Sequence, residues 1–389
     1  MENELNIKEH KLSKYCKFIL FLLCAIVFLN VISFWTEFSD FYRSYIYKPV
    51  SVFISRITSW GDVAIGEICM YVGMLMVVVS IIFVFLLLVL KREHSFKKFI
   101  RKYFKTELGI LLAIVLIYTL MWIIPLRASR ITFEDEKKGY SLAEVESVRN
   151  YILEQMELYA ALVPRNENEK IIYDFDLDYE TKKAVDKLAE EYPLFDGYQP
   201  PFKEAICSDF LEWMGIGGYT YPFTMEITCN KYVTNFSYPV LYSHELAHHN
   251  GYYRENEAEF FGMLAMIISD NPVLKYSGYY NAYYWIDQAY FQNMVKKYGL
   301  EISMDLYWKQ PQVSDLIRRD EVRNMEEFEM QYNEEVNSVL ENVAKKHAED
   351  VAEIGWDVQA DMLGEDNYDG VVKLLLDYFG EKIIKNKKN

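Results

Sequence analysis

The chain has 389 residues, and 57 Asp and Glu against 41 Lys and Arg give it a formal net charge of -16 at pH 7. Nucleic-acid phosphates are neutralised by clustered Lys and Arg, so this balance excludes a generally basic nucleic-acid-binding protein. Apolar residues are concentrated in the first third, through Leu126, whereas the sequence from Arg127 onward is mixed and acidic. That second part is long enough to bury a core of its own.

Three stretches are long and apolar enough to cross a bilayer, which takes about 20 residues in a helix. They are Phe18–Trp35, Gly66–Leu90 and Leu108–Leu126. No small-residue cleavage site follows the first, so we expect an uncleaved membrane anchor and not a signal peptide. Asn30 in this span is predicted to form an interhelical hydrogen bond, and Glu67 at a span end to stay hydrated. We therefore expect a membrane domain over residues 1–126 and a separate domain over residues 127–389.

Lys and Arg are concentrated between the second and third spans, in the loop Lys91–Lys105, and in the tail before the first span. Short loops rich in these residues stay in the cytoplasm. The pattern predicts a multi-pass protein of the cell membrane with a cytoplasmic N-terminus and, after three passes, an extracytoplasmic domain 127–389. The basic loop is interpreted as a topology signal beside anionic lipid, with no nucleic-acid partner.

The second part is predicted to be α+β and mostly helical. Ser141 and Glu144 form a capping box that starts a helix through Leu162. The alternating Tyr, Phe, Ile, Thr and Val of residues 219–236 predict one or two strands and hence a small sheet. Further helices are expected over residues 178–191, 241–250, 254–269, 278–298, about 324–351 and 371–379, with a short helical stretch from Pro200 toward Gly215. Cys207 and Cys229, the two cysteines of this part, are compatible with one disulfide or with two buried thiols.

The sequence His244-Glu-Leu-Ala-His248 carries the clearest chemical signal, an HExxH motif. Two histidines four positions apart leave the same face of a helix and can meet one tetrahedral Zn²⁺. Glu245 then lies beside the ion, where it can take a proton from an activated water and pass it to a leaving amine. The alternative is a surface helix with a chance histidine pair. His249 breaks the spacing and is predicted to be a neighbour, not a ligand.

A hydrolytic zinc site needs a third protein ligand and an open fourth position. Gly251 stands where it can end the motif helix in a left-handed turn, and the next helix offers Glu255, Glu257 and Glu259. At about 100° per residue Glu255 and Glu259 share a face with Gly262, while Glu257 points elsewhere. Glu255 is the favoured ligand, with Glu259 and Glu257 left as alternatives. Glu259 would then accept the free N–H of a ligating imidazole, and Glu257 would be a solvated residue at a helix N-terminus.

HExxH followed by Glu255-Asn-Glu-Ala-Glu259 resembles the gluzincin metallopeptidases, in which the first Glu of the second motif is a zinc ligand. More closely, the chain resembles the bacterial membrane family called domain of unknown function 3810. That resemblance lies in Ile46–Pro49, Gly218–Glu226, His244–His248, Arg254–Ala258 and Tyr276–Tyr279. It implies a zincin-like fold and a peptidase-like site, and it supplies no substrate.

In zincins an extended peptide often lies along an edge strand before the motif helix. The resemblance places that strand at Pro222–Cys229, with Pro222, Phe223 and Thr224 as substrate contacts; a plain structural strand is the alternative. Tyr276, Tyr279 and Arg254 are candidate donors to a tetrahedral oxyanion, each weighed against a packing role in a chain with 32 tyrosines.

The sequence therefore predicts a membrane-anchored zinc metallopeptidase that hydrolyses peptides or proteins outside the cytoplasmic membrane. A membrane sensor or scaffold with a structural or degenerate zinc site is the alternative. A transporter is disfavoured because the spans contain no paired charges or evident inverted repeat. The oligomeric state does not follow from these residues.

Overall fold

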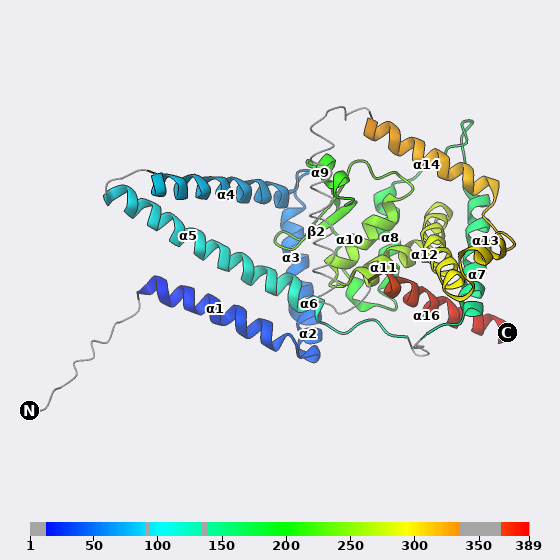
Figure 1. The fold of residues 1–389 in the computed structure, drawn as a ribbon, viewed down its shortest axis with the longest axis horizontal. Coiled ribbons are helices and arrows are strands. Elements are labelled where there is room, and N and C mark those ends of the chain that lie inside the picture. The colour runs from blue at the N-terminus through cyan, green and yellow to red at the C-terminus, as the bar shows by residue number, and fades with distance from the viewer. Residues whose placement is uncertain (1–12, 90–93, 134–138, 334–366, 389) are drawn as a thin grey trace, which may run out of the picture. The chain divides into compact units, whose positions relative to one another are not determined.

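The computed structural model of the chain describes residues 13–89, 94–133, 139–333 and 367–388. The chain divides into two compact units. The span unit comprises Met1–Tyr47 and Ile68–Ser129, and the domain unit comprises Lys48–Glu67 and Arg130–Asn389. Residues 48–67, which follow the first span and include the start of the second, thus group with the later part of the chain (Figure 1).

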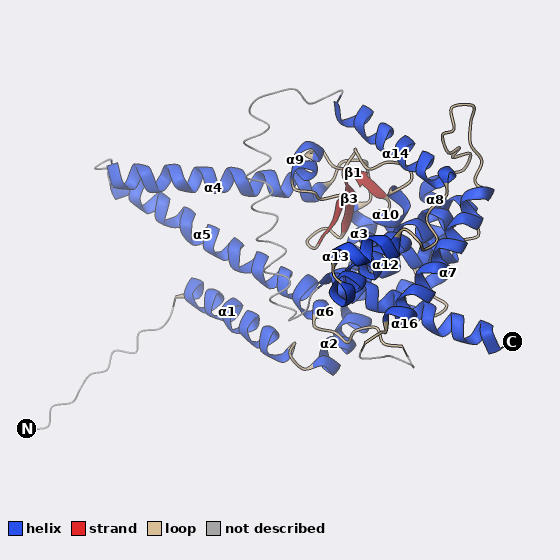
Figure 2. Cartoon of the chain, turned by 45° about the vertical axis from the view of Figure 1, so that its right-hand side comes forward, coloured by secondary structure: helices blue, strands red, loops and turns tan. Residues whose placement is uncertain are grey.

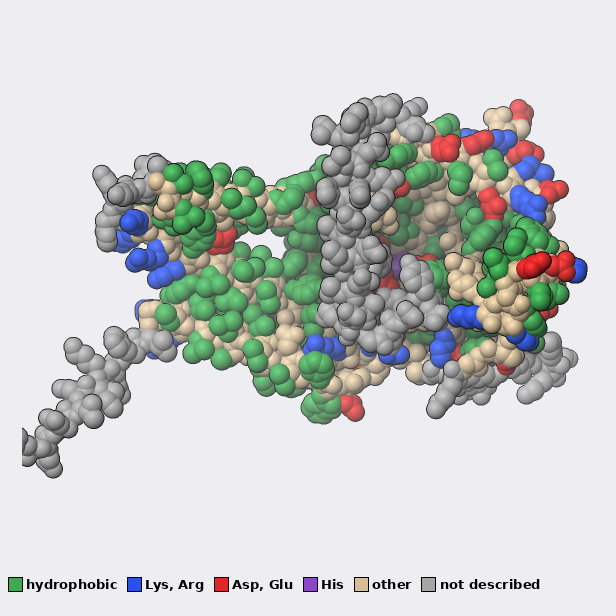
Figure 3. All heavy atoms as spheres, in the orientation of Figure 1, with side chains coloured by type: hydrophobic (Ala, Val, Ile, Leu, Met, Phe, Trp, Pro, Cys, Tyr) green, Lys and Arg blue, Asp and Glu red, His purple; other side chains and the backbone are tan. Residues whose placement is uncertain are grey.

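Three helical segments of the described chain are long and apolar enough to span a membrane: Lys14–Ile32, Ile65–Val89 and Ser95–Leu126. They coincide with the three predicted spans, and their apolar side chains are widely exposed (Figure 3). The helices of the span unit, with the first turn of α4 shared with the domain unit, are α1 (Lys14–Ile32), α2 (Thr36–Tyr42), η1 (Arg43–Tyr47), α4 (Ile65–Val89), α5 (His94–Tyr118), η2 (Thr119–Ile123) and α6 (Ile124–Leu126).

Two details of the span unit bear on the sequence predictions. The amide of Asn30 donates to the hydroxyl of Thr119 at 3.2 Å, which confirms the interhelical hydrogen bond. From His94 onward the basic segment is helical and not a loop, because α5 begins at His94. Lys and Arg are good helix formers, so the helix that carries the third span extends through them.

The domain unit is mostly helical with one small sheet (Figure 2). Ser141 caps α7 with both hydrogen bonds of the predicted capping box. The helices are α3 (Lys48–Thr58), α7 (Leu142–Leu162), α8 (Leu177–Leu188), η3 (Pro193–Phe195), α9 (Ser208–Trp213), α10 (Tyr238–His249), α11 (Glu255–Ile268), α12 (Pro272–Tyr298), α13 (Leu300–Tyr307), α14 (Asp315–Asn333) and α16 (Asn367–Lys388). The end of the predicted polar helix, up to residue 351, falls outside the described residues.

The sheet has three strands in the order β1-β3-β2. β1 (Phe202–Glu204) pairs parallel with β3 (Glu226–Cys229), and β2 (Gly218–Tyr221) pairs antiparallel with β3. The prediction of a helical stretch from Pro200 toward Gly215 is thus wrong in its first part, where β1 forms. Within this segment only α9 is helical. Three residues are too few for a strand to show its period, and only pairing with β3 makes this segment extended.

The core of the domain unit lies among α7, α10, α11, α12 and α16. Close packing of α11 uses two glycines: a Cβ on Gly262 would lie 2.7 Å from the carbonyl oxygen of Val240 on α10, and one on Gly278 of α12 would lie 2.8 Å from Cβ of Met266. Cys207 and Cys229 do not form a disulfide, and Cys229 is buried. Because Gly262 has no side chain, the backbones of α10, the motif helix, and α11 can lie in direct contact.

Candidate metal centre

The motif helix α10 presents two imidazoles on one face. Pro239 lies in its first turn, where a missing N–H costs nothing, and the helix runs through His249. The rings of His244 and His248 lie with their centroids 4.7 Å apart, as the four-residue spacing predicts. One helical turn therefore sets the two histidines side by side.

A sharp turn brings the next helix back against this face. Gly251 has φ 97°, a left-handed conformation that favours glycine, and α11 begins at Glu255. One carboxylate oxygen of Glu255 lies 3.2 Å from Nε2 of His244 and 3.6 Å from Nε2 of His248. The donor atoms of the three residues all lie within 4.8 Å of one another, a group that could hold a metal ion.

The other nitrogen of each imidazole faces an acceptor. Nδ1 of His244 lies 3.0 Å from a carboxylate oxygen of Glu259, and Nδ1 of His248 lies 2.9 Å from the carbonyl oxygen of Tyr252. Both contacts would hold the proton on Nδ1 of a neutral imidazole, and Nε2 of each ring faces the carboxylate of Glu255. The second oxygen of Glu259 accepts the indole N–H of Trp285 at 3.1 Å.

Glu257 lies elsewhere. Its carboxylate accepts the backbone N–H of Ile131 at 2.9 Å, and the residue is only 2% exposed. The prediction that it lies apart from the Glu255 face is consistent with this position, but the prediction that it is solvated is wrong. The backbone of residue 131 covers it, a long-range contact that helical periodicity does not contain.

The charges of the cluster counteract its burial. Burial alone would raise the pKa of Glu255, but the neighbouring His248 and His244 hold that pKa well below its usual value. Burial alone would lower the pKa of His244, but Glu255 and Glu259 raise it well above its usual value. The carboxylate of Glu255 is thus attracted electrostatically to the imidazoles as well as lying close to them.

Glu245 lies on the same helix and is 3% exposed. The hydroxyl of Thr220 in β2 lies 2.9 Å from its carboxylate and 2.8 Å from its carbonyl oxygen. Burial raises the pKa of this carboxyl, against the opposing effect of His248 and His244. Thr220 and Trp285 were not singled out in the sequence, since no local motif marks a residue that contacts α10 or α11 from another element.

The strand next to Glu245 is not the one expected. Within the described sheet β3 is central and all four of its residues are buried, so Pro222–Cys229 is not an edge strand. Pro222, Phe223 and Thr224 lie in the connection between β2 and β3. The edge strand beside the motif helix is β2, where a Cβ on Gly218 would lie 3.4 Å from Cγ of Glu245.

The candidate oxyanion donors occupy packed or terminal positions. The hydroxyl of Tyr276 is buried and donates to Asp320 at 2.9 Å, and Tyr279 stacks on Tyr159 with centroids 5.6 Å apart. Arg254 is the N-cap residue of α11, directly before Glu255. His249 faces away from the cluster toward α3, with Nε2 3.1 Å from the hydroxyl of Ser55.

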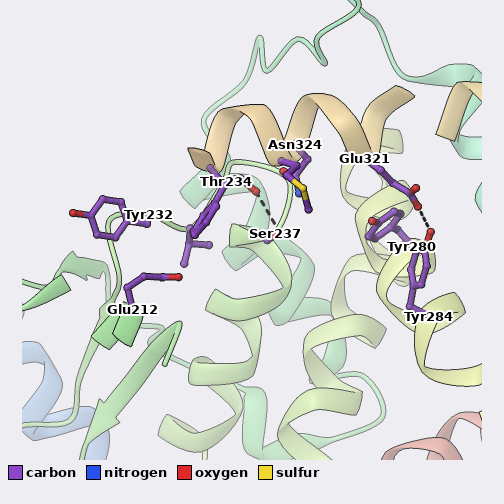
Figure 4. Close-up of a pocket in the computed structure, with 11 residues that line it drawn as sticks. Glu212, Tyr232, Thr234, Ser237, Tyr280, Tyr284, Glu321 and Asn324 are labelled. Atoms are coloured by element: carbon purple, nitrogen blue, oxygen red, sulfur yellow. Dashed lines mark hydrogen bonds between the residues drawn. The ribbon is translucent and has the colours of Figure 1, made fainter. Parts of the chain in front are cut away.

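A separate cavity of about 520 Å³ opens between α12, α14 and the segment before α10 (Figure 4). Tyr280 and Tyr284 line it from α12, and the Tyr284 hydroxyl donates to Glu321 of α14. His244, His248 and Glu255 are not among its lining residues. The cavity is therefore not the space between the three clustered donors.

Comparison with known proteins returns a family and no characterised relative. The family model described as "Protein of unknown function (DUF3810)" matches residues 42–376, which is most of the chain. No curated protein and no solved structure shows a significant match. The match includes the HExxH motif, Glu255 and the whole of the sheet, and the chain belongs to the family of proteins of unknown function designated DUF3810.

Proposed function

We propose that this protein is a membrane-anchored zinc metallopeptidase with a zincin-like site, which hydrolyses peptide bonds of peptides or proteins outside the cytoplasmic membrane. The observation that carries the proposal is the convergence of His244, His248 and Glu255, with donor atoms within 4.8 Å of one another. Two imidazoles and one carboxylate are the ligand set of a hydrolytic zinc site, and they leave a fourth position for water.

The surroundings of the donors support zinc over a chance histidine pair. Both Nδ1 atoms face acceptors, and both Nε2 atoms face the carboxylate of Glu255, the third proposed ligand. When bound, Zn²⁺ would supply a Lewis acid that polarises water and the substrate carbonyl. His244, His248 and Glu255 would hold the ion. Glu245 is the group placed to take the proton of the attacking water and return it to the leaving amine.

β2 offers a place for substrate. It is an edge strand in the described sheet, and its Thr220 touches Glu245. An extended peptide that added to this edge would run past the carboxylate that acts as base. Thr220 would be a positioning residue, because its hydroxyl orients Glu245 and does not need to contact the substrate.

The metal assignment is tested by zinc analysis of the purified full-length chain in nanodiscs. We expect about one zinc per chain in the wild type and in Glu245→Gln, and loss of zinc in His244→Ala and Glu255→Ala. Glu257→Gln is the matched control, because Glu257 lies on the same helix but bonds to Ile131. Full zinc content in a His244→Ala, Glu255→Ala double variant would rule out the site.

The activity is tested by incubating the wild type and Glu245→Gln with a complex peptide mixture and identifying new termini by mass spectrometry. We expect cleavage by the wild type and loss of at least about 10²-fold in Glu245→Gln, with zinc retained. Identical products from the two proteins would favour the non-catalytic sensor or scaffold.

A topology with three membrane spans is supported by the composition of the domain unit from two parts of the chain. Lys48–Glu67 and the sequence from Arg130 onward belong to this one unit, and the two spans Ile65–Val89 and Ser95–Leu126 separate them. The buried Lys203 Nζ donates to the carbonyl oxygens of Thr58 and Val63, so both parts must lie on the same side of a membrane. Three spans satisfy this, and a cytoplasmic N-terminus, which the Lys and Arg before the first span favour, would then put the domain unit outside.

The topology is tested with an impermeant maleimide in a background without native cysteines. A cysteine at the exposed Tyr179 of α8 should react in intact cells, and one at the exposed Lys98 only after permeabilisation. The reverse pattern would place the domain unit in the cytoplasm.

A further inference from the structure

Helix α3 buries its hydroxyl-bearing face and exposes its apolar face, the reverse of a helix on a water-facing surface. Its buried positions are Ser51, Ser55 and Thr58, which face the rest of the domain unit. The hydroxyl of Ser55 lies 3.1 Å from Nε2 of His249, and that of Thr58 donates to the carbonyl oxygen of Thr224 at 2.8 Å.

The outward side of α3 is apolar. Val50, Phe53 and Ile57 are 37%, 66% and 59% exposed and follow one another at intervals of three and four residues. This spacing places them on one face of the helix. This helix has its hydroxyl groups inward and large apolar groups outward. Its exposed face is therefore suited to contact with an environment less polar than water.

More large apolar side chains are exposed in the segment that follows α3 and in the segment that follows β1, the strand whose Lys203 donates to the carbonyl oxygen of Thr58. Trp60 is 94% exposed, and Val63, Ile206 and Phe210 are 53%, 63% and 49% exposed. We refer to the set Val50, Phe53, Ile57, Trp60, Val63, Ile206 and Phe210 as the apolar surface. All seven residues belong to the domain unit.

The apolar surface lies where a candidate span begins. Glu67 in the first turn of α4 is fully buried and accepts the backbone N–H groups of Ile206 and Cys207 at 2.9 and 2.7 Å. Its predicted hydration is therefore wrong. Its burial ties Ile206 to the first turn of a helix that continues for 25 residues to Val89, long enough to cross a bilayer.

A second anchor fixes the same turn. Glu226 of β3 accepts the N–H groups of Ile65 and Gly66 at 3.0 and 2.8 Å and pairs with Lys203 at 2.7 Å, both side chains being at most 2% exposed. The carboxylate caps the start of α4, where backbone N–H groups have no partner within the helix. The sheet is thus joined to the first turn of α4.

We propose that the apolar surface lies in the interfacial layer of the bilayer, at the boundary between headgroups and acyl chains. Chain continuity with α4 selects lipid over a second protein, because a span that begins at Ile65 places its neighbours at the membrane surface. An exposed tryptophan beside an amphipathic helix is the composition that prefers this layer. The domain unit would then rest on the membrane through α3 as well as being tethered to it.

The test uses the full chain in proteoliposomes of phosphatidylcholine and phosphatidylglycerol, on a Glu245→Gln background, so that its outcome does not depend on catalysis. Single cysteines at positions 53, 57, 60 and 206 carry an environment-sensitive fluorophore, quenched by doxyl-labelled lipid or by aqueous iodide. Position 75 in α4 is the control within the bilayer, and position 179 is the control in water.

We expect positions 53, 57, 60 and 206 to lose most of their emission to the lipid quencher and little to iodide, as position 75 does. Two outcomes overturn the proposal. Quenching by iodide alone would show that the surface lies in water, and protection from both quenchers would show that protein covers it. Retention of zinc by each labelled variant reports that the domain unit has folded.

Discussion

Glu259 illustrates how much of the candidate centre depends on a single carboxylate outside the three donors. Its two oxygens accept from Nδ1 of His244 and from Nε1 of Trp285 at the same time. Two acceptor oxygens are needed for this, and a carboxylate has them, whereas an amide has only one. Glu259 therefore orients His244 through a contact that its isostere cannot fully replace.

We expect Glu259→Gln to weaken zinc binding by about 10- to 100-fold, because one of its two contacts becomes a meeting of two donors. Competition with a chromophoric chelator on the purified chain measures this. Trp285→Phe should have a smaller effect, since it removes a donor and leaves Glu259 free to accept from His244. Wild-type affinity in Glu259→Gln would show that this carboxylate does not orient the imidazole.

Prediction from sequence was most informative at this scale. Helical geometry placed Glu255 on the face of Gly262, and in the structure Glu255 faces the two imidazoles while Glu257 bonds to Ile131. Helical geometry did not predict the contacts of Thr220 and Trp285, which lie 25 positions from Glu245 and 26 positions from Glu259, respectively. A local period carries information over a few turns and none on such contacts.

At the scale of elements, the close approach of α10 and α11 sets the distance between His244 and Glu255. Gly262 faces His244 directly: a Cβ there would lie 3.3 Å from His244 Cβ and 2.7 Å from the carbonyl oxygen of Val240. Backbone atoms cannot rotate away as a long side chain can. Any side chain at position 262 therefore separates the two helices.

Gly262→Ala should lower the free energy of unfolding by about 1–3 kcal/mol, the usual cost of overpacking a core. It should also weaken zinc binding, because Glu255 moves with α11. Thermal unfolding and chelator competition measure the two effects. Gly139→Ala, where an added Cβ meets nothing within 4 Å, is the control. Equal behaviour of the two variants would show that the helices are not in limiting contact.

The contact of α3 with α10 predicts a pH dependence. The ammonium of Lys48 donates to the side chain of Asn250 at the end of α10, and burial lowers the pKa of this lysine from 10.5 to about 8. Between these values the unfolded chain binds the proton and the folded chain does not, so the contribution of Lys48 to stability rises with pH.

Comparison with a Lys48→Met variant isolates this contribution. The unfolding free energy of the wild type minus that of the variant should increase from pH 8 to pH 10.5 and level off outside that window. Chemical unfolding of both proteins across the range measures it. Lys98→Met, at an exposed position of the span unit, is the control. Parallel curves for wild type and Lys48→Met would contradict the lowered pKa.

On the scale of the whole molecule, the domain unit includes the segment between two spans and the first turn of α4. The connection after β2 meets this turn, since a Cβ on Gly66 would lie 2.5 Å from the ring of Tyr221 and 3.2 Å from the hydroxyl of Thr224. β2 has four residues and spans about 13 Å at roughly 3.3 Å per residue. The strand beside Glu245 therefore ends close to the beginning of a candidate span.

If the proposed peptidase activity and the membrane position of the apolar surface both hold, peptides cut close to a membrane anchor should be the preferred substrates. We expect a cleavable peptide joined directly to a lipid in proteoliposomes to be hydrolysed faster than the same peptide behind a 30-residue Gly-Ser spacer. Both are concentrated on the membrane, so a difference reports position. Mass spectrometry measures the rates, and equal rates would contradict the preference.

Sequence patterns were sufficient to predict the three apolar helices, the capping box of α7, the motif helix and the mostly helical character of the later part. Each of these depends on a period, a composition or a spacing that is complete within one segment. A helix forms its hydrogen bonds within itself, so its signal is local.

The folded structure was needed to show which strand is the edge, that Glu257 and Glu67 are buried, and that α3 belongs with the domain unit. These features depend on partners far away in the chain: β3 between two other strands, Ile131 over Glu257, and Ile206 and Cys207 on Glu67. A strand or a buried carboxylate is satisfied by groups outside its own segment, and no local pattern names them.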